Sequence, residues 1–231
     1  MVLFILAAIK LTLYAKYKQG DIISGKQLMA EQLTAYQTPI PKHLRIEGFQ
    51  SVKIIPSDTF YFEAGKNGNR LQEKPYSWHD DTLQIRGDLT ITRNFMGYLD
   101  NQSGSWQIIV YCPVIEDIQL RNVDADITQN HHSGITHYNF SLDNARLSVG
   151  SNDPDNSAPT GEFAGIRLHS IQSIITLAEN AYIDTLSIWL DKKSSTRDNG
   201  AAVNTLMITC PEKASINLTA ANIKKLKLIT E

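Results

Sequence analysis

The sequence predicts an all-β fold, a right-handed parallel β-helix (a β-solenoid), behind an N-terminal membrane-anchor helix. Three observations support this prediction. Residues 1–18 hold a long apolar run. From residue 42 onward, short segments of alternating apolar and polar residues follow one another without a helical period. An apolar-x-Leu motif then recurs in the second half of the chain. We therefore expect an anchor (1–18), a stalk (19–41) and a β-solenoid head domain (42–231).

The anchor prediction rests on the segment "MVLFILAAIKLTLYAKYK". Its apolar part is shorter than the roughly 20 residues of a typical membrane-spanning helix, and Lys10 would have to reach an interface. A cleaved signal peptide is a second reading, although the usual basic start and small-residue cleavage site are missing. A buried helix of a soluble protein is a third. We favour the anchor, with a translation start upstream of Met1 as a variant.

The orientation of this anchor stays open. Lys16, Lys18 and Lys26 follow the apolar run, and the positive-inside rule would place that side in the cytoplasm. Basic residues upstream of Met1 would reverse this. Pro39 and Pro41 close the stalk, because the residue before each proline is pushed toward extended geometry.

Strand signals begin directly after the stalk. Alternating segments occur at residues 44–49, 52–56, 59–65, 81–91 and 105–113, with an Asn-Gly turn signal in "KNGN". In the second half, "IQLRNVDADI", "FSLDNARLSV", "IRLHSIQSII" and "INLTAANIKK" share one frame, marked by Leu120, Leu142, Leu168 and Leu218. Corner residues Asn122, Asn144, Ser170 and Ala220 follow, and such small polar residues suit left-handed corners. Stacked coils would bury the leucines together.

The segments "LRIEGFQSVKI", "DTLQIRGD" and "CPVIEDIQLRNVDADI", followed by the repeated coils, resemble the head GIN domain family of bacterial adhesins, which is common in Bacteroidetes. The resemblance covers about residues 43–231. The family usually has Gly at the corners that are Asn122, Asn144 and Ser170 here. The resemblance implies parallel β-helix coils in a membrane-tethered or exported domain, and it carries over no catalytic residues.

Charge and composition exclude some partners. The chain has 231 residues and a formal net charge of −2, so no basic excess exists to neutralise phosphates, and we expect no nucleic-acid binding. A core of this size needs no metal or disulfide. We assign no catalytic, cofactor-binding or metal-binding residue and expect no cofactor.

Several polar residues have side chains that could bind a metal ion, but we interpret them as surface or loop residues. His131, His132 and His137 lie close in sequence, but adjacent histidines on a strand point to opposite sides. The insertion at residues 150–161 offers Asp153, Asp155 and Asn156 to calcium but lacks the Gly and distal Glu of an EF-hand loop. Whether this loop binds calcium stays open.

Asp124 and Asp126 form the best carboxylate pair on a strand, since residues i and i+2 share a face. Glycan-cleaving enzymes use paired carboxylates, but no further element of such a site appears in the sequence. Aromatic residues able to stack on sugars, which packing in the core explains equally well, are Tyr76, Trp78, Trp106, Tyr138, Tyr182 and Trp189.

The two cysteines, Cys112 and Cys210, each precede a proline and share the spacing Cys-Pro-x4-Ile-x-Leu. Regular stacking would hold them about 19 Å apart, too far for a disulfide. We interpret them as two instances of one structural corner.

These observations predict a non-enzymatic, membrane-tethered domain of the cell envelope, an adhesin or binding module that presents a β-helix face to carbohydrate or protein. Its head domain would lie in the periplasm or outside the cell, and its partners would be the membrane and a glycan or protein ligand. The alternatives are an envelope polysaccharide-cleaving enzyme and a structural or regulatory module of an envelope-sensing, anti-sigma-like system.

Overall fold

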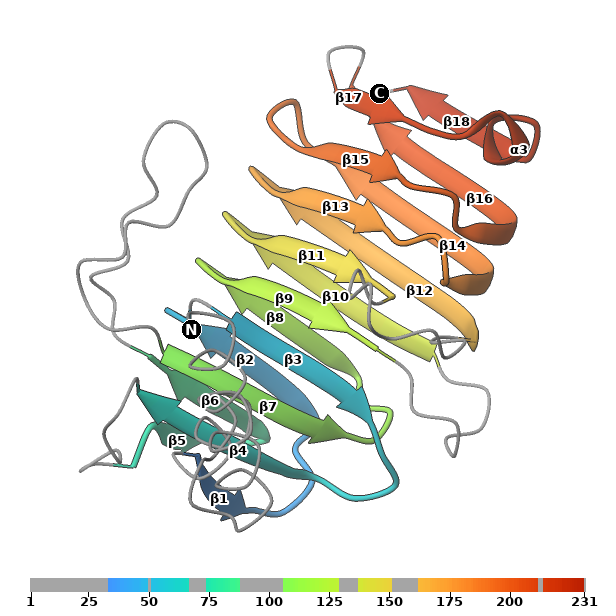
Figure 1. The fold of residues 1–231 in the computed structure, drawn as a ribbon. Helices are drawn as coiled ribbons and strands as arrows, with labels where there is room; N and C mark the ends of the chain where they lie inside the picture. Colours follow the sequence, from blue (N-terminus) through green and yellow to red (C-terminus); the bar gives the residue numbers. More distant parts are fainter. Residues whose placement is uncertain are drawn as a thin grey trace, which may run out of the picture.

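The structure is a computed structural model that describes residues 33–49, 51–66, 74–87, 106–128, 137–150, 162–211 and 214–230. Nearly all regular structure in these ranges is β-strand, so the all-β prediction is right. Two nine-stranded sheets pack face to face (Figure 1). In spatial order, sheet A contains β1 (Thr34–Gln37), β4 (Tyr61–Lys66), β7 (Trp106–Cys112), β3 (Ser51–Pro56), β9 (Asp124–Ile127), β11 (Arg146–Val149), β13 (Ile174–Leu177), β15 (Ser195–Asp198) and β17 (Ser215–Asn217).

Sheet B lies behind sheet A in Figure 1. In spatial order, its strands are β18 (Leu226–Thr230), β16 (Ala202–Cys210), β14 (Tyr182–Leu190), β12 (Glu162–Ile171), β10 (His137–Asp143), β8 (Asp117–Arg121), β2 (His43–Glu47), β6 (Thr82–Arg86) and β5 (Tyr76–His79). One short helix, α3 (Ala220–Ile223), precedes β18.

The prediction of a right-handed parallel β-helix is wrong. The strands form two mixed sheets rather than a closed solenoid, because β1 pairs antiparallel with β4, β4 with β7, and β5 with β6. The error has a physical reason. Alternation of apolar and polar residues fixes which face of a strand is buried, but it is the same for parallel and antiparallel neighbours.

The predicted anchor at residues 1–18 lies outside the described residues. Within the described ranges, no helix has the length and apolar character needed to cross a membrane. β1 falls inside the range predicted as stalk and pairs with β4. The domain boundaries stay a prediction.

The core lies between the two sheets and is built from alternate residues of both. Leu120 and Leu142 are register partners in adjacent strands, as the repeat predicts. Further along, the predicted frame slips by two residues, since Leu142 pairs with Ser170 and Phe140 with Leu168. Leu218, the last residue of the predicted frame, follows β17 of the other sheet.

The actual period in the C-terminal part is 20 residues. Ile166, Leu186, Leu206 and Leu226 are register partners across β12, β14, β16 and β18. The first three are buried and the last, on the outermost strand, is half-buried.

Residues with positive φ form the corners that lead from sheet B to sheet A. Asn122, Asn144 and Gln172 have φ of 51°, 49° and 50°, a region that Asn adopts more readily than most residues. The Asn144 Nδ2 donates to Asn122 Oδ1 at 2.5 Å, so successive corners are tied together. The prediction of left-handed corners at the two asparagines is therefore right, whereas Gln172 rather than Ser170 takes the third.

The two cysteines are free and buried, but they do not occupy equivalent positions. Cys112 ends β7 of sheet A, and Cys210 ends β16 of sheet B. The interpretation as two instances of one corner is wrong. Both thiols face the core, where burial raises the pKa of Cys112 to about 12.

Candidate functional site

Most loop residues considered as ligands lie outside the described residues, namely His131, His132, Asp153, Asp155 and Asn156. His137 begins β10 and is exposed. Its ring lies over Gly165 of β12, where an added Cβ would come within 2.5 Å of His137 Nδ1. Among the described ranges, no three His, Cys, Asp or Glu residues are grouped as metal ligands would be.

Asp124 and Asp126 lie on the outer face of sheet A, as the i, i+2 spacing predicts. The Arg146 Nε lies 3.9 Å from Asp124 Oδ1. Asp126 is the register partner of Lys53 on one side and Ser148 on the other. Desolvation raises the pKa of Asp126, and a hydrogen bond with Ser148 opposes that rise. Both aspartates therefore interact with side chains of a neighbouring strand in sheet A.

Of the six aromatic candidates, two are part of the packed interior. Tyr138 is buried, and its hydroxyl donates to the Cys112 carbonyl at 3.2 Å. Tyr76 packs edge-on against Tyr36. Trp78 of β5 is 37% exposed. Trp106 begins β7, but its side chain is not among those described.

The remaining two candidates lie on the outer side of β14. Tyr182 is 57% exposed, and Trp189 is half-buried. The Trp189 ring stacks on His169 of the adjacent strand β12, with centroids 4.2 Å apart and planes at 2°. His169 and Thr209 are the register partners of Trp189 on the two neighbouring strands. One face of the indole therefore packs against His169, and the other is directed toward Thr209 of β16.

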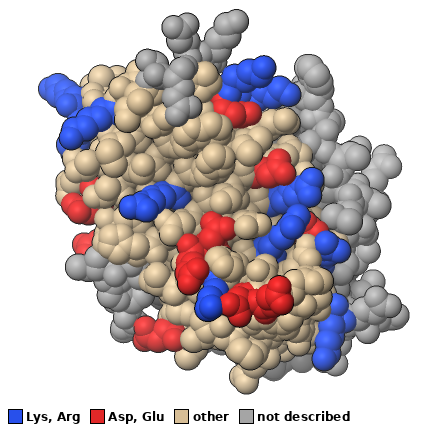
Figure 2. Space-filling view, turned by 180° about the vertical axis from the view of Figure 1, so that it is seen from behind, with Lys and Arg blue, Asp and Glu red and all other residues tan. Residues whose placement is uncertain are grey.

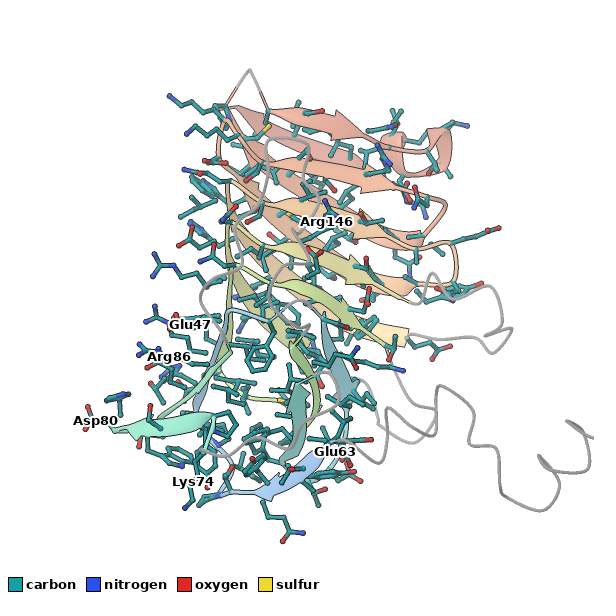
Figure 3. The ribbon with its side chains drawn as sticks, turned by 60° about the vertical axis from the view of Figure 1, so that its left-hand side comes forward. Glu47, Glu63, Lys74, Asp80, Arg86 and Arg146 are labelled. Carbon is teal, nitrogen blue, oxygen red and sulfur yellow. The ribbon has the colours of Figure 1, made fainter. Side chains whose placement is uncertain are left out.

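The outer face of sheet B has two halves of different character. Figure 2 shows charged residues close together from the middle to the lower right of this side, further ones near its upper corners and left edge, and a largely uncharged area between them. In the charged half, Glu47 of β2 accepts from Arg86 Nε at 2.6 Å, and Arg45 Nη2 lies 3.3 Å away. Glu47 and Arg86 lie side by side in Figure 3. Gln84 Nε2 also donates to Glu47, whose side chain is only 6% exposed.

A pocket of about 330 Å³ opens in the other half, at the beginnings of β12, β14 and β16. The polar side chains of its lining are those of Glu162, Tyr182, Asp184 and Asn204. Phe163, Ile183 and two alanines complete the lining. The Asn204 Nδ2 donates to Asp184 Oδ1 at 3.1 Å, which fixes the carboxylate relative to the amide. The pocket thus combines an exposed ring, two carboxylates and one amide.

A local change in strand geometry sets the pocket apart from the rest of the face. In β14 the buried side chains are Ile183 and then Leu186, so both Asp184 and Thr185 avoid the core. The burial pattern of β16 slips in the same way at Asn204 and Thr205. The beginnings of β14 and β16 therefore form a distinct part of the outer surface of sheet B, a facet that contains Asp184 and Asn204.

The sequence analysis singled out Tyr182 but missed Glu162, Asp184 and Asn204. The signal that finds them is the 20-residue period. Tyr182 is the register partner of Glu162 and of Ala202, which places residues two positions further, Asp184 and Asn204, beside one another.

Comparison with known proteins assigns no family. No family model and no curated protein matches the chain, so the likeness to head GIN domains stays a resemblance of sequence motifs. Among solved structures, the chain is similar to a "putative lipid binding protein" from Parabacteroides distasonis, at 11% identity and a TM-score of 0.44, covering 80% of this chain and 73% of that one. It is also similar to a "putative adhesin" from Parabacteroides merdae, at 9% identity and a TM-score of 0.33, covering 86% and 92%. Both TM-scores are below 0.5, so neither likeness assigns a function.

Proposed function

We propose that this chain is a non-enzymatic, membrane-tethered binding module of the cell envelope, and that the outer face of sheet B binds carbohydrate. The observation that carries the proposal is the pocket around Tyr182. There an aromatic ring that is 57% exposed lies beside three planar polar side chains, so flat apolar area and hydrogen-bonding groups meet in one hollow.

The chemistry of the pocket suits a sugar ring. The apolar C–H face of a sugar can stack on the Tyr182 ring, as aromatic side chains offer flat apolar area with a polar end. Carboxylate and amide groups then bond to sugar hydroxyls, since ionised Asp and Glu accept and Asn both donates and accepts. The volume of about 330 Å³ lies at the small end of ligand sites.

Trp189 provides a second aromatic contact on the same strand. It lies seven positions after Tyr182, a span of roughly 20 Å along a strand. A ligand that used both rings would therefore be an oligosaccharide. Beyond Asp184, the surface between them carries uncharged side chains of β14 and β16, among them Thr185, Ser187 and Met207.

Glycan binding is tested with an array of oligosaccharides, followed by calorimetry on every hit. We expect Tyr182→Ala to weaken binding about tenfold or more, which corresponds to about 1.4 kcal/mol. Trp78→Ala is the matched control, because it removes a partly exposed aromatic from β5, at the far end of the same sheet. Equal loss in both variants, or no hit on the array, contradicts the proposal. A protein ligand captured through Tyr182 would replace carbohydrate as the partner class.

A glycan-cleaving enzyme is the second candidate, favoured by one observation. Glu162 and Asp184 lie diagonally on adjacent strands, and strand spacing and rise place their Cβ atoms roughly 8 Å apart. That is within the range of carboxylate separations in glycosidases. Incubating each bound glycan with the protein and analysing its chain length separates the two functions. If the protein shortens the glycan and the Glu162→Gln variant does not, the protein is a glycan-cleaving enzyme.

The tether and the envelope location rest on the apolar segment at residues 1–18. Fractionation of cells that express the full chain, compared with a chain starting at residue 19, tests both. We expect the full chain with membranes and the shortened chain in the soluble fraction. Protease added to intact cells and to spheroplasts then reports the side on which the β-sheet domain lies.

A further inference from the structure

The charge of the pocket is one-sided. Glu162 and Asp184 contribute two carboxylates, and none of the described residues that line the pocket is Lys, Arg or His. Lys225 is close in the fold, but its Nζ donates to the Val203 carbonyl, so it is directed to the backbone of β16. The site therefore presents negative charge that no lining residue neutralises.

The carboxylates also lack donors for most of their lone pairs. One oxygen of Asp184 accepts from Asn204, and no other bond from a lining residue to either carboxylate is described. An ionised carboxylate has about four acceptor sites and no donor. A ligand that fits here must supply donors, and an ammonium group supplies three together with the complementary charge.

The Tyr182 ring selects for the same kind of group. A cation held over an aromatic face is attracted by the ring quadrupole, and this ring is more than half exposed on the facet that carries Asp184. A neutral sugar would use the ring and the hydroxyl contacts alone. A sugar with a free amine would use these contacts and the charge as well.

We propose that the pocket formed by Glu162, Tyr182, Asp184 and Asn204 selects sugar units with a free, protonated amino group, such as the glucosamine units of a deacetylated polysaccharide. The inference rests on the proposed glycan binding and specifies its substrate class. N-acetylation removes the positive charge and adds bulk at the amine. Comparing an acetylated ligand with its free-amine counterpart therefore separates amine selectivity from glycan binding as such.

The test uses calorimetry of the full chain in detergent with two matched ligands, an oligomer of β-linked glucosamine and its fully N-acetylated counterpart. We expect the free-amine oligomer to bind about tenfold more tightly, a difference that corresponds to a single charge-assisted contact. Added salt should reduce this preference, because charge interactions are screened.

The variants Glu162→Gln and Asp184→Asn should bring the two affinities together while leaving the melting temperature unchanged, since both side chains are exposed. Glu116→Gln is the control, as it neutralises an exposed acid in the charged half of the same face. It should keep the full preference.

Failure of the amine selectivity and failure of the proposed glycan binding give different results. Equal binding of both oligomers overturns the amine selectivity and leaves glycan binding standing. Absence of binding by either oligomer, and by every other glycan on the array, overturns the proposed function together with the inference. Equally tight binding of a lysine-rich peptide at the pocket overturns the sugar assignment, because the site would then recognise ammonium groups on proteins.

Discussion

In the first part of the chain, through β7, strands run in both directions, whereas every described pair from β8 onward is parallel. The two regions also satisfy their polar groups differently. The first relies on ion pairs at the outer face, with Glu47 between Arg45 and Arg86. The second has the exposed or half-exposed pairs Arg121–Asp143 and Arg146–Asp124. It adds hydrogen bonds at its corners, most of them buried, to Ser194, Asp191 and Asp198.

The difference explains where the candidate site lies. In the parallel region, corner contacts repeat with the period and fix the register from inside the fold. Ser173 N donates to Ser194 Oγ at 3.1 Å, for example, and Ala145 N donates to Ser173 Oγ at 2.9 Å. Outer side chains such as Tyr182 and Asp184 are then not needed to hold the strands and are available for a ligand.

The largest expected effect tests the corners. Asp198 is 7% exposed and accepts from Gly200 N, Ala201 N, Thr219 N, Thr219 Oγ1 and Asn222 Nδ2. Asp198→Ala leaves several buried donors unsatisfied, and we expect a loss of about 3 kcal/mol in the free energy of unfolding, measured by urea denaturation. Asp184→Ala, which removes an exposed aspartate, should change it by less than about 0.5 kcal/mol. Similar values for the two would contradict the role given to buried corners.

The next effect tests the ion pairs of the first region. Glu47→Gln keeps the shape of the side chain and removes the charge between two arginines. We expect a loss of about 1–2 kcal/mol, between the values for exposed and buried pairs, because both arginines are partly exposed. Added salt should shrink this loss but leave that of Asp198→Ala unchanged. The comparison between the regions fails if both losses respond alike.

A smaller gain is expected inside the parallel region. The Thr196 hydroxyl is buried in the core face of β15 and has no hydrogen-bond partner among the described residues. Thr196→Val should raise the free energy of unfolding by about 1 kcal/mol, because it replaces an unsatisfied polar atom with a methyl group. Thr176→Val, on the outer face of neighbouring β13, is the control and should have little effect. A loss of stability in Thr196→Val would show that the hydroxyl has a partner.

The smallest expected effect is the pH dependence of stability that the ionisation of Asp198 contributes. Burial alone would raise the pKa of Asp198, but hydrogen bonds from Thr219, Asn222 and Gly200 outweigh it and lower the pKa below its ordinary 3.8. A lowered folded-state pKa gives stability that is fully present above the unfolded value and is lost as the pH falls through the folded one. Melting temperatures of the protein and of Asp198→Asn should therefore differ at pH 7 and converge as the pH falls through the lowered pKa of Asp198. A difference that stays constant into the acid range would contradict the assignment.

The sequence predicts which face of a strand is buried and which residues form the left-handed corners. Period-2 alternation correctly indicated that Leu120 and Leu142 are buried, and Asn122 and Asn144 were recognised as left-handed corners because short polar side chains tolerate positive φ. Strand direction was not predictable in the same way. β4 and β7 alternate like any other strands, yet they pair antiparallel.

The candidate site was predictable only in part. The exposed ring of Tyr182 is a candidate from its chemistry alone, but the pocket depends on the register of three strands. The leucine repeat predicts Leu168 beside Leu142, two residues from its true partner Phe140. The serine at position 170 hides the true frame, since a polar residue occupies an inward column between Leu142 and Leu190. Hydrogen bonding to Ser194 at the corner makes that exception stable.

The constant 20-residue offset between β12, β14 and β16 constrains how this protein can change in length. Removing or duplicating one whole unit leaves every inward residue inward and every corner in place. A change of one residue more or less turns the outer side chains of the following strand toward the core. The pocket draws its walls from three consecutive units, so a homologue that has lost or gained a unit here would keep the fold and alter its ligand.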